Sequence, residues 1–235
     1  MSRRAKLAIL ISACVIVAGT GAAFAAPLIY RSFVAAPAAK VPSLTAEDSA
    51  LDPNTGDPLD PAALSGSWTV TEGSVAGYRV DEVLNGTDVT VTGRTSQVTG
   101  SITTKDLTLT DGELTVDVAS IATDQPARDS YFRDQALRVS EFPTATFALT
   151  EPATASAAPK TGIASEQELT GDLTIAGETR SVTFTVQVST DGETTRVAGQ
   201  IPITFADYGV EAPSLGFVSV DPTGFVEFDL TLTRS

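Results

Sequence analysis

The segment GFVEFDLTLT, residues 224–233, alternates apolar and polar side chains. Its apolar residues share one face of an extended chain: Val226, Phe228, Leu230 and Leu232. Glu227, Asp229 and Thr231 fall on the other face, so the segment is predicted to be a half-buried antiparallel strand. The same period of two recurs in ELTVDV (residues 113–118) and SVTFTVQV (residues 181–188), which indicates an all-β domain.

Dipeptides that favour tight turns separate the alternating segments: Asn85-Gly86, Asp111-Gly112, Ala176-Gly177 and Asp191-Gly192. Asn-Gly and Asp-Gly are strong hairpin signals, because both residues tolerate a positive φ. The alternating segments number roughly eight or nine over about 165 residues, which is the range of a closed barrel or a sandwich.

One segment interrupts the β pattern. Residues 127–138 contain no proline or glycine and are predicted to form a short helix, which Pro143 stops. The alternation resumes in TATFAL, residues 144–149. Residues 151–167 are predicted to form a polar, mobile loop.

The composition excludes most catalytic chemistry. The chain has no histidine and a single cysteine, Cys14. The commonest general base, the Ser-His-Asp triad, disulfides and thiolate metal sites are therefore removed. Pairs of carboxylates are expected by chance among 29 acidic residues, so they do not indicate a hydrolase. We predict a protein that is not an enzyme, with no catalytic residue, no metal site and no cofactor.

Charge is distributed unevenly along the chain. Residues 1–40 carry five basic side chains and no acid, whereas residues 41–235 carry 10 basic and 29 acidic side chains, a net charge of −19. Such acidity repels phosphate groups, so nucleic acid is not an expected partner. It suits a well-hydrated domain outside the cytoplasm.

Residues 7–30 form an uncharged run of 24 residues behind a basic N-terminus. A helix of this length spans about 36 Å, enough to cross a bilayer. Three readings compete: cleavage of a signal peptide after Ala25, lipidation of Cys14, or retention as a single-pass anchor. Retention is favoured because the run continues to Arg31. All three export the domain, which is then held at the cell membrane or, if cleaved, secreted.

Three parts follow from these patterns. Residues 1–31 are the anchor or signal segment, and residues 67–235 are the β domain. Residues 32–66 are rich in alanine and proline and lack periodicity. They are predicted to be a flexible linker that lifts the domain off the membrane.

The chain resembles the YceI-like family of lipid- or polyisoprenoid-binding domains. The resemblance rests on DVASIATDQPARDSYFRDQALRVSEFPTATFAL (residues 117–149), LTGDLTIAGETRSVTFTV (residues 169–186), ITFADYGV (residues 203–210) and the closing GFVEFDLTL. Trp68 and VAGYRV fit the family's first strand, so the likeness covers residues 67–234. An apolar N-terminal segment with a proline-rich linker resembles the anchored form of actinobacterial members.

The resemblance implies an extended, lipocalin-like antiparallel β-barrel around an apolar tunnel, with an isoprenoid or other long-chain lipid as the partner. The candidate tunnel-lining residues are Tyr78, Phe132, Leu137, Phe142, Phe147, Leu173, Ile175, Phe184, Val186, Phe205, Phe217 and Phe228. The alternative is that these side chains pack the barrel shut, which would make it a structural or interaction domain of the cell envelope.

One motif departs from the family pattern. The family's Arg-Asp-x-His-Leu block reads Arg128-Asp129-Ser130-Tyr131-Phe132, with tyrosine in place of histidine, and Ala136-Leu137 replaces a Phe-Phe pair. Arg128, Asp129 and Tyr131 are candidates for contact with a ligand headgroup. The other reading is a structural clasp, in which Asp129 caps the turn and Arg128 pairs with a carboxylate. The ligand's identity and the oligomeric state are left open.

Overall fold

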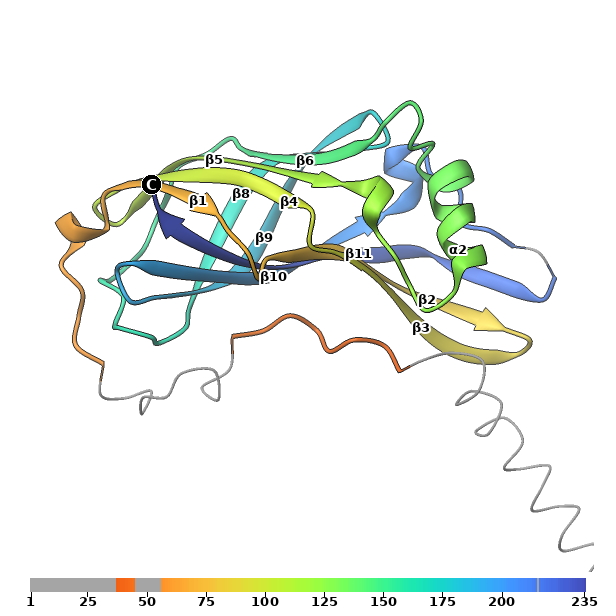
Figure 1. Ribbon diagram of the computed structural model, residues 1–235, viewed down its shortest axis with the longest axis horizontal. Helices are drawn as coiled ribbons and strands as arrows, with labels where there is room; N and C mark the ends of the chain where they lie inside the picture. The colour runs from red at the N-terminus through yellow and green to blue at the C-terminus, as the bar shows by residue number, and fades with distance from the viewer. Residues whose placement is uncertain (1–36, 45–55, 215) are drawn as a thin grey trace, which may run out of the picture.

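Eight antiparallel strands close into a barrel in the part of the chain that the computed structural model describes, residues 37–44, 56–214 and 216–235 (Figure 1). Their order around the barrel is β1-β4-β5-β6-β8-β9-β10-β11, and pairing of β1 with β11 closes the ring. The strands are β1 (Gly66–Val70), β4 (Val98–Lys105), β5 (Thr108–Asp117), β6 (Thr144–Leu149), β8 (Ser165–Ile175), β9 (Glu178–Thr190), β10 (Thr194–Thr204) and β11 (Val218–Arg234).

Three further strands extend this sheet: β2 (Val75–Leu84), β3 (Thr87–Thr95) and β7 (Ala153–Thr154). β11 pairs with β1 near its C-terminal end and with β2 along its N-terminal part. β3 pairs with β2, and β7 pairs with the start of β5. The expected all-β barrel is confirmed, with these strands added to the eight that form its wall.

Three of the four predicted turns join neighbouring strands: Asn85-Gly86, Ala176-Gly177 and Asp191-Gly192. The prediction for Asp111-Gly112 is wrong, because both residues lie inside β5. Gly112 pairs with Ile102, and the register shifts between Thr103 and Thr104, as at a bulge. The β4–β5 turn lies at Asp106, which has a φ of 54°.

The predicted helical segment comprises α2 (Pro126–Tyr131) and a π-helical turn (Phe132–Ala136). Pro126 occupies the first turn, where its missing N–H costs nothing. The helical segment ends at Leu137, before Pro143, and β6 begins at Thr144. Figure 1 shows α2 at the end of the barrel where β2 and β3 extend beyond it. Short 3₁₀ turns complete the described elements: Pro61–Leu64, Val118–Ser120 and Phe205–Tyr208.

Within the described ranges, no helix is long and apolar enough to cross a membrane. The predicted anchor or signal segment, residues 1–31, lies outside those ranges.

Two described parts of the predicted linker contact the barrel. Leu59 N–H donates to Pro159 O at 2.9 Å, beside the barrel end. Residues 37–44, which we call the strap, cross the outside of the sheet (orange-red in Figure 1). Ala39 N–H donates to Thr92 Oγ1 on β3 at 3.2 Å, and the buried Leu44 donates its N–H to Gln187 on β9 at 2.7 Å. These parts of the predicted linker therefore contact the domain, whereas residues 32–36 and 45–55 lie outside the described ranges.

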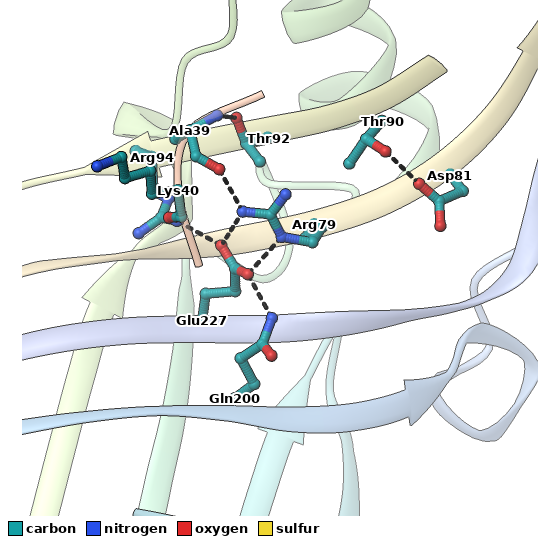
Figure 2. Close-up of polar contacts among 9 residues, drawn as sticks. All are labelled: Ala39, Lys40, Arg79, Asp81, Thr90, Thr92, Arg94, Gln200 and Glu227. Carbon is teal, nitrogen blue, oxygen red and sulfur yellow. Dashed lines mark hydrogen bonds and ion pairs between the residues drawn. The ribbon is translucent and has the colours of Figure 1, made fainter. Parts of the chain in front are cut away.

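A fully buried carboxylate lies beneath the strap. Glu227 projects from the outer face of β11, where the alternation predicts a solvated side chain, yet its side chain is 0% exposed. Arg79 Nε contacts its Oε1 at 2.6 Å, Gln200 Nε2 donates to the same oxygen at 2.5 Å, and Arg94 Nη2 donates to Oε2 (Figure 2). We call these four side chains the Glu227 cluster.

The strap adds two hydrogen bonds to this cluster. Arg79 Nη2 donates to Ala39 O at 2.5 Å, and Arg94 Nη2 donates to Lys40 O at 3.3 Å (Figure 2). Burial lowers the pKa of the Arg94 guanidinium, and the nearby Glu227 carboxylate opposes that shift. Buried charges need both a partner and filled hydrogen bonds, and the strap carbonyls supply part of the latter.

A glycine lets Arg94 reach Glu227 across β2. Gly77 pairs with Glu227 on one side and with Arg94 on the other. Side chains at directly paired positions point to the same face of a sheet, so a side chain at position 77 would stand between the two charges. A Cβ there would also lie 1.8 Å from Gly93 O.

We expect Glu227→Gln to loosen the strap. Removing one partner of a buried ion pair costs about 3–5 kcal/mol. The strap is held by the same guanidinium groups, so its release would let water reach them. The free energy of unfolding should fall, and trypsin cleavage after Lys40 should become faster. Urea unfolding and limited proteolysis of the full chain measure these two effects.

The matched control is Asp81→Asn. Asp81 accepts a hydrogen bond from Thr90 Oγ1 at 2.6 Å on the same face of the sheet, away from the strap carbonyls (Figure 2). Cleavage after Lys40 should be unchanged in this variant. Equal cleavage rates in the two variants would show that the Glu227 cluster does not hold the strap.

Candidate functional site

The barrel encloses a cavity of about 260 Å³. All eight barrel strands contribute to its wall, because each presents alternate side chains to the interior. The wall is mainly aliphatic and aromatic. Its apolar wall suits part of a long apolar molecule.

Three phenylalanines of the wall contact one another edge to face. Phe184 lies between Phe147 and Phe228, with ring centroids 5.4 and 6.1 Å apart in edge-to-face geometry. Six of the residues predicted to line a tunnel border this cavity: Phe147, Leu173, Ile175, Phe184, Val186 and Phe228. Each lies on the inward face of a barrel strand.

The other six predicted residues lie outside the cavity wall: Tyr78, Phe132, Leu137, Phe142, Phe205 and Phe217. Tyr78 stacks on Phe132 of the π-helical turn, with centroids 4.7 Å apart, because the helical segment covers the inner face of β2 there. Leu137 is buried in the core beside the helical segment. Tyr78, Phe132 and Leu137 have apolar neighbours, as their hydrophobicity predicts, but these neighbours belong to the core around the helical segment and not to the cavity wall.

Three of these outer residues have distinct neighbours. Phe142 carries the Arg138 guanidinium over its ring at 5.0 Å. Phe205 packs against a small cluster formed by Val80, Val89 and Val91. Phe217 has most of its side chain in solvent.

Sequence reasoning misses much of the cavity wall. The alternation assigns Leu114, Val116 and Val226 to inward faces, but it gives no reason to prefer them to aromatic residues as ligand contacts. The segment 151–167, predicted to be a mobile polar loop, lines the cavity through Ala153, Ala155, Ala157, Pro159, Ser165 and Gln167. The alanines at every second position are the sequence signal that could have indicated an inward-facing extended segment here.

The cavity has one polar end. The polar residues there come from the β4–β5 turn, the start of β8 and the β9–β10 hairpin: Thr104, Asp106, Ser165, Gln167, Thr190 and Thr195. Thr104 Oγ1 accepts from Trp68 Nε1 at 3.0 Å, and Thr195 Oγ1 donates to Thr190 Oγ1 at 2.8 Å. Hydroxyl groups thus gather where the strands leave the barrel.

The opposite end is closed by apolar side chains. Val118, Ile121, Leu137 and Tyr208 are buried in the core, in the segments that follow β5 and β10 and in the helical segment. Burial raises the pKa of the Tyr208 phenol, so this group stays neutral. A ligand in the cavity has a polar environment at one end only.

The Arg128-Asp129 pair lies with α2, far along the fold from the polar end. Arg128 contacts Glu82 Oε1 and Asp124 Oδ1, each at 2.9 Å. Asp129 Oδ1 accepts from Thr123 N–H at 2.9 Å and from its hydroxyl at 2.7 Å. These contacts match the structural clasp considered from the sequence, and the Arg128–Glu82 ion pair attaches α2 to β2.

Tyr131, which stands in place of the histidine of the family motif, lies outside the cavity wall. It is 37% exposed. The neighbouring Tyr78 is buried, which raises its pKa above the usual tyrosine range, and Arg128 opposes that shift. Within the described ranges, no group of histidine, cysteine, aspartate and glutamate side chains could hold a metal ion.

Solved structures of other proteins share this fold. The polyisoprenoid binding domain from Saccharophagus degradans is 19% identical, with a TM-score of 0.57, over 73% of this chain and 99% of that one. Burkholderia cenocepacia BcnA is 20% identical, with a TM-score of 0.52, over 66% of this chain and 95% of that one. At these identities the likeness shows the fold alone. No curated protein matches the chain by sequence.

The family is shown by the sequence match. Residues 68–232 match the YceI-like domain, a segment that begins in β1 and ends in β11. It therefore includes the closing strands, the cavity wall and α2. The chain belongs to the YceI-like family.

Proposed function

We propose that this protein binds a long apolar lipid of the isoprenoid class in its barrel cavity, outside the cytoplasm and attached to the membrane by its N-terminal segment. The apolar cavity inside the barrel is the observation that carries the proposal. Burying each CH₂ group of a ligand there contributes roughly 0.8 kcal/mol. The polyisoprenoid binding of the Saccharophagus degradans domain supports the choice of ligand class.

The alternative of a filled barrel fits the structure less well. Phe147, Phe184 and Phe228 contact one another on the wall, yet a cavity of about 260 Å³ remains inside. Interiors normally leave few voids larger than a water molecule, because lost contacts are costly. A cavity of this size in a natural barrel is better explained by an occupant.

The polar end indicates an uncharged headgroup. Among the described residues that border the cavity, the only ionisable side chain is Asp106, and none is lysine or arginine. A diphosphate is normally bound by cations or by clustered N–H groups. Hydroxyl and amide groups suit an alcohol or a carbonyl oxygen instead.

Filling the cavity should abolish lipid capture without unfolding the barrel. Gly112 borders the cavity, and a Cβ there would lie no closer than 3.4 Å to Ile102. We expect Gly112→Leu to project into the ligand space. Native mass spectrometry of the full chain, loaded with a polyprenol, should show loss of the bound lipid, with the thermal midpoint of the empty protein retained.

The control for this variant is Glu113→Leu. Glu113 is the next residue of β5 and is exposed on the outside of the barrel. It adds the same side chain where no ligand lies, so polyprenol capture should be unchanged. Capture by Gly112→Leu at the level of this control would contradict the proposed site, and absence of any polyprenol from the unmodified chain would contradict the proposed function.

Headgroup charge should decide between ligands of equal tail length. We expect a polyprenol to raise the thermal midpoint of the full chain more than the corresponding polyprenyl diphosphate, because only binding to the native state stabilises it. Asp106→Asn should reduce this difference, since it removes the negative charge at the polar end. Stronger stabilisation by the diphosphate would show that a cationic site outside the cavity wall governs the headgroup.

A further inference from the structure

The strap is the first described part of the chain, and it is hydrogen-bonded to the outside of the sheet. Its first described residue is Pro37, and Ala39 is bonded on both sides, to Thr92 through its N–H and to Arg79 through its carbonyl. Six residues, 31–36, separate the strap from the uncharged run of residues 7–30. Six residues span at most about 20 Å. A membrane anchor in that run would therefore hold this face of the barrel near the bilayer.

The exposed apolar side chains gather around the same face. Of the five large apolar residues exposed in the described ranges, four belong to the strap or to β2, β11 and the residue before β11: Val41 (47%), Val83 (39%), Phe217 (58%) and Phe225 (38%). The fifth, Tyr131, belongs to α2. Single exposed apolar residues are ordinary on proteins, but their collection on one face is informative.

Strand register places the side chains of Phe225 and Val83 on the same face as the strap. Phe225 pairs directly with Arg79, whose guanidinium bonds the strap, so both point to the outer face. Val83 is four residues along β2 from Arg79 and therefore shares that face. Phe217 lies beside the β2–β3 turn, where its carbonyl accepts from Asn85 N–H at 2.7 Å.

We propose that this strap face, defined by residues 37–44 and the outward side chains of β2, β3 and the N-terminal half of β11, docks on the surface of a lipid bilayer. The inference rests on the membrane attachment in the proposed function. Phenylalanine and valine side chains favour the boundary between headgroups and acyl chains, where their apolar parts leave water. A ligand would then exchange between the bilayer and a barrel held against it.

The charged side chains of the strap face indicate which kind of lipid bilayer it suits. Asp81, Asp88 and Asp221 are exposed near the apolar side chains, whereas Lys40 is the exposed cation of the strap. Arg79 and Arg94 are engaged by the buried Glu227. Attraction to anionic lipid is thus not the driving force, and the face suits a zwitterionic bilayer, such as phosphatidylcholine, contacted through apolar side chains.

Hydroxyl-radical footprinting of the full chain tests this surface. The chain is compared in phosphatidylcholine vesicles, recovered by flotation, and in detergent. We expect oxidation of Phe217 and Phe225 to fall several-fold in vesicles, whereas that of Tyr131 should stay the same. Tyr131 is an internal control, because it is an exposed ring away from the strap face.

A pair of variants sharpens the test. Phe225→Asp adds a charge to the proposed contact and should restore oxidation of Phe217 in vesicles. Tyr131→Asp adds the same charge on α2 and should leave Phe217 protected. Both residues are partly exposed, so neither substitution removes a core side chain.

Each other outcome overturns a defined part of the inference. A chain that floats with the vesicles while Phe217 and Phe225 are oxidised as in detergent is attached but not docked through this face. A chain that does not float refutes the membrane attachment and, with it, the docking. Protection that already exists in detergent and rises with protein concentration assigns the face to a second copy of the chain instead.

Discussion

The pairing of β1 with β11 is the contact on which the rest of the structure depends, because it turns an open sheet into a barrel. Three residue pairs make it, from Trp68 opposite Arg234 to Val70 opposite Leu232. The Arg234 guanidinium also lies over the Trp68 ring at 5.1 Å. Without this closure the inward faces of the strands would meet water, and no enclosed apolar cavity would exist.

The long strand β11 connects the cavity to the strap face. Its inward side chains, including Phe228, line the cavity, and its outward Glu227 lies at the centre of the buried cluster beneath the strap. Successive side chains of a strand point to opposite faces, so one strand serves both surfaces. The strap and the cavity therefore lie on opposite faces of the same sheet.

Local pattern predicted the strands and their faces well. The alternation in residues 224–233 placed Phe228 and Leu230 inside, where both are buried. The turn prediction failed for Asp111-Gly112, because a turn dipeptide inside a paired strand has the same local sequence as one at a hairpin. The alternation also wrongly predicted a solvated side chain for Glu227. The strap that covers this carboxylate, residues 37–44, is far from β11 in the sequence.

The all-β class, most of the hairpins, the short helical segment before Pro143 and the likeness to the family could all be predicted from the sequence. Each of these features depends on residues that are close together in the chain. Which apolar residues border the cavity depends on the folded barrel and could not be predicted from local pattern. Tyr78 and Phe184 carry the same local signal, yet one lies under α2 and the other lines the barrel interior. The reason is that the neighbour across a strand's face is set by barrel closure and by the docking of distant segments, which no local period encodes.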